Sequence, residues 1–273
     1  MNDALLLYCR PGFESECAQE IAGRTGAQTE RGDGFVVCAS AQQADWRELI
    51  FARQCLVAFA HLSGLPRNDR LTSIIAALRE RNEKLNDVWT EAPDSDAGKQ
   101  LAPLCKSFGN ALVGALKKAQ LLDAHAPRRL HVFFPQGDEV YLCTADPEIC
   151  APWPQGIPRL KFPREAPSRS TLKLEEAFLT LLDDGERARW LKAGMTAVDL
   201  GAAPGGWTYQ LARRSIRVVA VDNGPMDRTL LDSGLVQHRR EDGFRFRPAK
   251  PVDWLVCDMV EQPRRVAELI AHW

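Results

Sequence analysis

The sequence predicts an α/β protein in which two small α+β units precede a unit built around a parallel-rich sheet. Its 273 residues give room for roughly two domains, or three small ones. After residue 168, short apolar runs alternate with helical patterns, which is typical of β-α-β units. A proline-rich stretch separates this part from the residues before it.

The composition limits the class of protein. It is 45% hydrophobic and 26% charged, which excludes collagen-like, low-complexity and wholly disordered chains. No apolar run approaches the roughly 18 residues of a membrane span, and the N-terminus turns polar too early for a signal peptide. The eight cysteines form no zinc-ligand pattern. We therefore expect a cytoplasmic protein with reduced, mostly buried cysteines, no metal and no membrane contact.

The first predicted unit, residues 1–62, mixes strands with helices. Its expected elements are strand 5–9, helix 13–22, strand 35–38, helix 46–55 and strand 56–62.

The second predicted unit, residues 63–146, starts at the break Gly64-Leu65-Pro66 and ends in a hairpin turned at Gln136-Gly137-Asp138. Its expected elements are helix 71–85, strand 88–90, helices 99–108 and 111–122, and strands 130–134 and 140–143.

A basic linker is predicted over residues 147–167. Six prolines lie between residues 146 and 167, and proline removes backbone donors. Residues 1–150 carry a net charge of −4 and the rest +3, while residues 159–173 hold five cations against one glutamate. Such a stretch suits a phosphate backbone, although an ordinary solvated linker explains the charge equally well. The candidate RNA-binding residues are Arg159, Lys161, Arg164 and Arg169.

The third predicted unit, residues 168–273, has the β-α-β pattern. Its expected elements are helix 170–182, strand 196–200, helix 207–214, strand 217–221, a weaker helix and strand, strand 252–257 and helix 263–273.

A glycine-rich turn follows the first strand of this unit, in the run VDLGAAPGGW at residues 198–207. Glycines between a strand and a helix let a ligand approach the backbone, so we expect a nucleotide-like cofactor there. A dinucleotide site would need G-x-G-x-x-G, and here Ala203 and Pro204 interrupt it, which disfavours a nicotinamide-dependent oxidoreductase. The candidate cofactor-binding residues of the turn are Asp199, Gly201, Ala203, Pro204, Gly205 and Gly206.

Three further carboxylates follow predicted strands. Asp222 ends the second strand, where a carboxylate can accept hydrogen bonds from ribose hydroxyls, or it is a turn residue. Asp242 follows the third strand, where it would read an adenine or again belong to a turn, and Asp258 ends the fourth. Because parallel strands share one carboxyl edge, Asp199, Asp222 and Asp258 should converge there.

The run SRSTLKLEE, residues 168–176, resembles the segment before the fold in RrmJ-like 2'-O-ribose methyltransferases. These enzymes use a Lys-Asp-Lys-Glu tetrad, and Lys173 and Asp258 match its first two members. A wider resemblance is carried by the runs LYCRPGFE (7–14), IFARQ (50–54), GIPRLKFPREAPSRSTL (156–172), DLGAAPGGWTYQL, VDNGPM, REDGF and CDMVE. Through these runs, nearly the whole chain resembles the ribosomal RNA large subunit methyltransferase M family.

The resemblance implies a fold, a cofactor and a substrate. The fold would be a Rossmann-like S-adenosylmethionine methyltransferase domain after RNA-recognition-like and THUMP units. The substrate would be one cytidine ribose of 23S rRNA, methylated by a monomer before or during large-subunit assembly. Lys173 and Asp258 would be catalytic. The cofactor contacts it implies are Ser170, Ala203 to Gly206, Asp222, Asp242 and Asp258.

The chain departs from this pattern beyond Asp258. The tetrad's second lysine and its glutamate have no counterpart there, and four strands are predicted where the fold has seven. We therefore expect a C-terminally shortened chain with an incomplete sheet. A non-catalytic RNA-binding or S-adenosylmethionine-binding protein is the alternative.

Overall fold

The computed structural model describes residues 3–273 and divides the chain at Pro158 and Arg159 into two compact units. Unit 1 comprises the residues up to Pro158, and unit 2 those from Arg159 onward. Among the described residues, no helix is both long and apolar enough to cross a membrane.

Unit 1 is built on one seven-stranded sheet with the order β2-β3-β1-β4-β7-β6-β5. All neighbours are antiparallel except β5 and β6, which are parallel. Because β4 pairs with both β1 and β7, this sheet runs without a break through the predicted units 1–62 and 63–146. The strands are β1 Ala4–Cys9, β2 Thr29–Gly32, β3 Phe35–Cys38, β4 Ala52–Leu62, β5 Val88–Glu91, β6 Arg129–Gln136 and β7 Glu139–Ala145.

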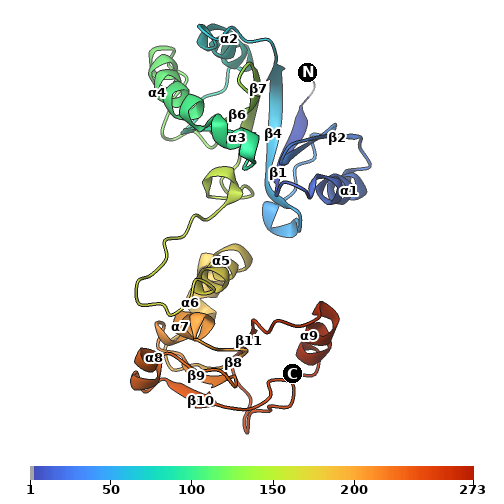
Figure 1. The fold of residues 1–273 in the computed structure, drawn as a ribbon. Helices are drawn as coiled ribbons and strands as arrows, with labels where there is room; N and C mark the ends of the chain where they lie inside the picture. The colour runs from blue at the N-terminus through green and yellow to red at the C-terminus, as the bar shows by residue number, and fades with distance from the viewer. Residues whose placement is uncertain (1–2) are drawn as a thin grey trace. The chain divides into compact units, whose positions relative to one another are not determined.

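The helices of unit 1 pack on this sheet in two groups, one on each side of β4 (Figure 1). Ile21 of α1 is buried against β1, β3 and β4, while Leu112 and Leu116 of α4 are buried with α2 over the other strands. Residues four apart lie on one face of a helix, and burying each leucine stabilises the fold by about 1.5–3 kcal/mol. The helices are α1 Glu14–Thr25, α2 Leu71–Arg81, α3 Asp96–Gln100 and α4 Ala102–Lys118.

Two predictions for unit 1 are wrong. The predicted helix 46–55 is a three-residue 3-10 turn, Trp46–Glu48, followed by the start of β4. β4 is central and buried on both faces, so its apolar run has no alternation that distinguishes it from a helix. The two predicted helices 99–108 and 111–122 form mainly one helix, α4, which continues through Gly109. A Cβ there would lie 2.6 Å from Thr90 Oγ1, so this glycine allows close packing on β5 and does not end the helix.

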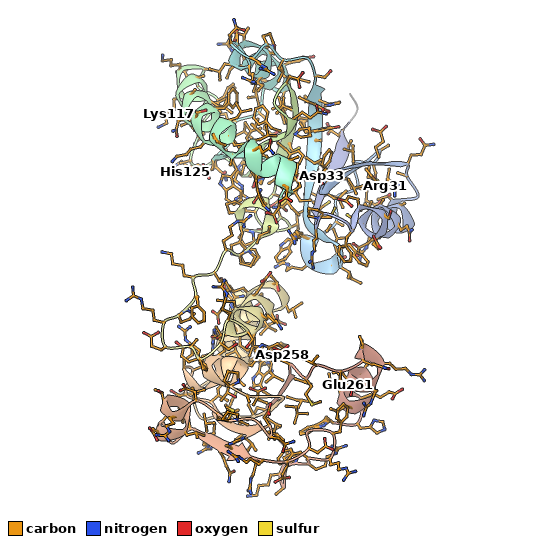
Figure 2. All side chains as sticks on the ribbon, viewed as in Figure 1. Arg31, Asp33, Lys117, His125, Asp258 and Glu261 are labelled. Atoms are coloured by element: carbon orange, nitrogen blue, oxygen red, sulfur yellow. The ribbon has the colours of Figure 1, made fainter. Side chains whose placement is uncertain are left out.

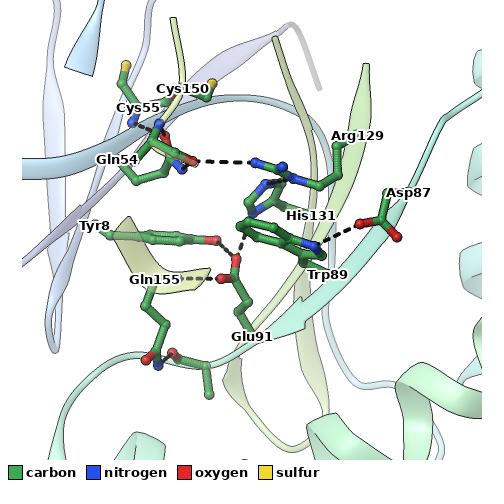
Figure 3. Close-up of polar contacts among 12 residues, drawn as sticks. Tyr8, Gln54, Cys55, Asp87, Trp89, Glu91, Arg129, His131, Cys150 and Gln155 are labelled. Atoms are coloured by element: carbon green, nitrogen blue, oxygen red, sulfur yellow. Dashed lines mark hydrogen bonds and ion pairs between the residues drawn. The ribbon is translucent and has the colours of Figure 1, made fainter. Parts of the chain in front are cut away.

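The first part of the predicted linker is held on unit 1 (Figure 3). The buried amide of Gln54 accepts from Ala151 N at 2.9 Å and donates to Ala151 O at 3.1 Å. The buried carboxylate of Glu91 accepts from Gln155 N at 2.5 Å, Tyr8 Oη at 3.0 Å and His131 Nδ1 at 2.6 Å. Two side chains of the sheet therefore fix the backbone after β7.

Unit 2 contains the predicted parallel sheet, with the order β10-β9-β8-β11. β8 Thr196–Leu200 and β9 Arg217–Val221 have the predicted bounds, and β10 Val236–Arg239 and β11 Trp254–Cys257 complete the sheet. This confirms the predicted fold class. Because all four strands are parallel, their carboxyl ends lie at one edge.

Helices cover both faces of this sheet. Leu174 and Phe178 of α5 pack with Leu211 of α7 on one face, and Leu269 of α9 packs on the other. α6 is not predicted from the sequence and begins at a capping box of Asp183 and Glu186. The helices are α5 Thr171–Leu181, α6 Asp184–Trp190, α7 Gly206–Ala212, α8 Arg228–Asp232 and α9 Pro263–Ile270.

Candidate active site

The glycine turn between β8 and α7 is as tight as the sequence predicts. Gly201 and Gly205 have φ angles of 78° and 119°, in the left-handed region that glycine favours. A Cβ on Gly206 would lie 2.1 Å from Ser170 Oγ, so this glycine lets the start of α5 lie against the turn. Trp207 Nε1 donates to Ser170 O at 3.0 Å and fixes the same contact. Ser170 is thereby placed beside the glycine turn.

Asp199 lies beneath this turn and is fully buried. Its Oδ2 accepts from Thr208 Oγ1 at 2.7 Å, whereas its Oδ1 has no partner among the described residues. Burial raises the pKa of Asp199 to about 7, against the hydrogen bond from Thr208, and the charges of Asp258 and Asp222 raise it further. Such a carboxyl group is a candidate functional residue as well as a structural one.

Asp222 and Asp242 lie where the two neighbouring strands end. Asp222 Oδ2 accepts from Ala203 N at 3.0 Å, and its Oδ1 accepts from Gly224 N at 2.7 Å, so it bridges two turns. Asp242 Oδ1 accepts from Phe244 N at 2.9 Å, which is the turn geometry that the sequence left open. Both carboxylates also line a pocket, so the turn role and a binding role are compatible.

This pocket, of about 390 Å³, opens at the carboxyl edge of the sheet. Among residues 3–273, five carboxylate residues line it, and no lysine or arginine does. A negative pocket favours a ligand with positive charge and hydroxyl or amino donors, and it repels a pyrophosphate. The lining residues are Gly201, Ala203, Val221, Asp222, Asn223, Glu241, Asp242, Gly243, Phe244, Asp258, Met259, Val260 and Glu261.

Lys173 and Asp258 meet at this edge although 85 residues separate them. Lys173 Nζ, on the first turn of α5, lies 3.1 Å from Asp258 Oδ1 and 3.3 Å from Oδ2. Asp258 directly follows β11 and, with the nearby Glu261, is labelled in Figure 2. The Lys173 side chain is 64% exposed and that of Asp258 31% exposed, so a substrate can reach the pair.

Apart from Lys173, the predicted site residues thus fall into three groups. Five of them line the pocket: Gly201, Ala203, Asp222, Asp242 and Asp258. Five others lie in or under the adjoining turn and helix: Ser170, Asp199, Pro204, Gly205 and Gly206. The basic residues do not line the pocket: Arg159, Lys161, Arg164 and Arg169. Of these, Arg169 lies over the ring of Phe162, with 5.8 Å between guanidinium carbon and ring centre.

Sequence reasoning missed several pocket residues. Asn223, Glu241, Phe244, Met259 and Glu261 line the pocket beside predicted residues. Their signal was position alone, since each lies within three residues of a predicted aspartate at a strand end.

Comparison with known proteins assigns three successive parts of the chain to family models. Three family models match: the RlmM ferredoxin-like domain over residues 1–56, the ribosomal RNA large subunit methyltransferase M N-terminal domain over 69–146, and the FtsJ-like methyltransferase over 166–268. Among solved structures, TrmN from Thermus thermophilus aligns with a TM-score of 0.44 at 19% identity, over 98% of this chain and 82% of that one.

The curated relatives are much more similar. A ribosomal RNA large subunit methyltransferase M from Xanthomonas oryzae is 56% identical over 98% of this chain and 82% of its own length. One from Xanthomonas campestris is 55% identical with the same coverage. The aligned region covers 98% of this chain and therefore extends through both units. The chain therefore belongs to the ribosomal RNA large subunit methyltransferase M family.

Proposed function

We propose that this protein transfers a methyl group from S-adenosylmethionine to the 2'-hydroxyl of a cytidine ribose in 23S rRNA. The observation that carries the proposal is the ion pair of Lys173 and Asp258, at 3.1 Å, on the rim of a pocket that Asp258 also lines. One residue thus belongs both to the cofactor pocket and to the pair that would face the substrate.

The residues of the pocket fit this cofactor. S-adenosylmethionine has a sulfonium cation, an ammonium group and two ribose hydroxyls, and it lacks the pyrophosphate that five carboxylates would repel. Asp222 would accept from the ribose hydroxyls, Asp242 would bind the adenine, and Ser170 and residues 203–206 would contact the cofactor beside them. The unpartnered Oδ1 of Asp199 leaves a buried acceptor under the same turn.

The chemistry needs little from the protein beyond position and charge. Bound S-adenosylmethionine supplies a methyl group on an electrophilic sulfonium, and the leaving thioether needs no proton. A ribose hydroxyl is a weak nucleophile, so Lys173, as an ammonium, would hold the hydroxyl in line and stabilise the negative charge that develops on its oxygen while the proton passes to solvent. Asp258 orients the Lys173 ammonium through two oxygens. Proximity and alignment should supply most of the acceleration.

We propose that the rest of the chain binds RNA. Residues 1–62 would form the RNA-recognition-like part and residues 63–146 the THUMP part of unit 1, with 168–273 as the methyltransferase part. Phosphates of the RNA would be neutralised by the basic residues of the linker and the segment after it, Arg159, Lys161, Arg164 and Arg169. The local charge of residues 159–173, five cations against one glutamate, supports this assignment.

The test combines calorimetry of S-adenosylmethionine binding with transfer of labelled methyl groups to unmodified 23S rRNA on one sample. Binding heat together with transfer is the expected result. Binding heat without methyl transfer would mean that the protein binds the cofactor but is not an enzyme. Absence of heat would refute the assignment of S-adenosylmethionine as the cofactor.

Three finer expectations remain. Action before or during large-subunit assembly and a monomeric state rest on the family resemblance, and a cytoplasmic location rests on the composition. Each stays a prediction.

A further inference from the structure

The connection from β10 to β11 leaves part of the unit 2 sheet uncovered. β10 ends at Arg239, and β11 begins at Trp254 on the far side of β9 and β8. A crossover between parallel strands normally places a helix on the face that it passes. Residues 240–253 contain no helix, and a hollow of about 710 Å³ remains between this loop and the sheet. We call it the crossover hollow.

The crossover hollow has an apolar floor and a cationic rim. Val219 and Val252 on the floor belong to the same hydrophobic cluster as Phe246. The rim carries four cations and one anion, Glu241, which gives a net charge of +3. The four cations are Arg217, Arg239, Arg247 and Lys250.

These cations have no carboxylate partner among residues 3–273. The side chains of Arg239 and Lys250 make no hydrogen bond or ion pair there, and the side chain of Arg217 donates only to Gly194 O at 3.4 Å. Arg247 donates to two backbone carbonyls, at 3.2 and 2.7 Å. In contrast, five other arginines of unit 2 pair with carboxylates: Arg187, Arg214, Arg245, Arg264 and Arg265. Four cations around one hollow repel one another, which an anionic ligand would relieve.

We propose that the crossover hollow binds a segment of rRNA, with phosphates on the cationic rim and bases against the apolar floor. The proposal rests on the proposed function for the identity of the nucleic acid. Guanidinium groups match phosphate oxygens in geometry as well as charge. Each nucleotide also carries an apolar base face, which suits the valine floor. An acidic polypeptide would satisfy the rim, but it lacks this regular combination of anion and flat apolar surface.

The crossover hollow is distinct from the cofactor pocket. Glu241 lines both, so they adjoin, but the pocket is lined by five acidic residues and the hollow by four basic ones. The hollow would therefore add RNA affinity without changing the methyl-transfer step. This predicts a higher KM for RNA, with unchanged kcat, when its cations are removed.

The test uses the full chain carrying Arg239→Ala and Lys250→Ala together. Fluorescence anisotropy with a labelled 23S rRNA fragment is measured without cofactor over a range of KCl concentrations. Two lost phosphate contacts should weaken binding about tenfold or more at low salt and reduce the slope of log affinity against log salt by about 1.5. The matched control is Arg189→Ala with Lys192→Ala, two exposed cations that lie outside the hollow, and it should change affinity less than about twofold.

Two results would overturn the proposal. One is a hollow variant whose affinity and salt slope equal those of the control. The other is unchanged RNA binding with lost binding of polyglutamate, which would make the hollow a protein-docking surface. Because anisotropy needs no turnover, a failure of the proposed methyl transfer would leave this measurement interpretable.

Discussion

The burial of the Asp199 carboxyl group makes the stability of unit 2 depend on pH. Its pKa is raised from 3.8 to about 7 in the folded protein, mainly by burial. The folded protein therefore holds this proton more tightly than the unfolded chain, and the free energy of unfolding of unit 2 falls as pH rises from about 4 to about 7. The maximum loss is about 4 kcal/mol, since a tenfold change in proton affinity is worth about 1.4 kcal/mol.

Asp199→Asn should abolish that pH dependence. The amide keeps the shape of the side chain and still accepts from Thr208 Oγ1, but it has no proton to lose. Hydrogen exchange of peptides within residues 196–212, corrected for intrinsic rates, measures the local opening free energy in both proteins. Equal declines with pH in wild type and variant would refute this account of Asp199.

Lys173→Met should slow methyl transfer and leave cofactor binding intact. Lys173 does not line the pocket, so the Kd for S-adenosylmethionine should change less than about twofold, while the loss of the positive charge beside the reacting hydroxyl lowers kcat by about 10²–10³-fold. The control is Lys192→Met, an exposed lysine outside the site. If both variants have wild-type kcat, the assigned role of Lys173 is wrong.

At the scale of elements, the contact between α5 and the glycine turn depends on Gly206. In Gly206→Ala the new Cβ meets Ser170 Oγ and the backbone N of Thr171, which must move apart. Unit 2 should lose about 1–3 kcal/mol of stability, and cofactor affinity should fall about tenfold.

The control for Gly206→Ala is Gly114→Ala in α4. A Cβ at Gly114 meets nothing within 4 Å, and alanine stabilises a helix by about 0.5–1 kcal/mol relative to glycine. Scanning calorimetry measures the stability of each variant, and titration calorimetry measures its cofactor affinity. A Gly206→Ala protein as stable as the wild type would contradict the close contact between α5 and the glycine turn.

Glu91 holds the segment after β7 on unit 1. Burial raises the pKa of Glu91, but His131 and the hydrogen bonds from His131, Gln155 N and Tyr8 outweigh this and lower it. Its contribution to stability is therefore present above about pH 4.5 and is lost as pH falls below that value. The network is shown in Figure 3.

In Glu91→Gln, unit 1 should lose about 3 kcal/mol, because buried donors lose a charged acceptor. Amide exchange of residues 149–156 should rise at pH 7, whereas Glu80→Gln, at an exposed position on α2, should leave it unchanged. Equal protection of that segment in the two variants would show that Glu91 does not anchor it.

Sequence patterns were sufficient where a short apolar run ends at a turn with distinctive residues. β8, β9 and the glycine turn follow from short apolar runs and from glycine chemistry. They were insufficient for β4, whose two buried faces remove the periodicity of its apolar residues. They were also insufficient for Gly109, which continues helix α4 and is small because α4 packs closely on Thr90 of β5. The ion pair of Lys173 with Asp258 needed the family resemblance, since a surface lysine has no distinctive local pattern.

At the scale of the whole molecule, negative and positive charges are concentrated at different places. The cofactor pocket is negative, whereas residues 159–173 and the rim of the crossover hollow are positive. A net charge of −1 for the chain conceals this division. The same molecule can therefore attract a sulfonium cation at one place and a polyanion at others.

The most direct test of the central claim is to locate the transferred methyl group. The full chain and its Asp258→Asn variant are incubated with S-adenosylmethionine and unmodified 23S rRNA, and the nucleosides are identified by mass spectrometry. We predict 2'-O-methylcytidine at one position with wild type and its loss with the variant. A methyl group on a base, no transfer by wild type, or equal transfer by both proteins would contradict the account.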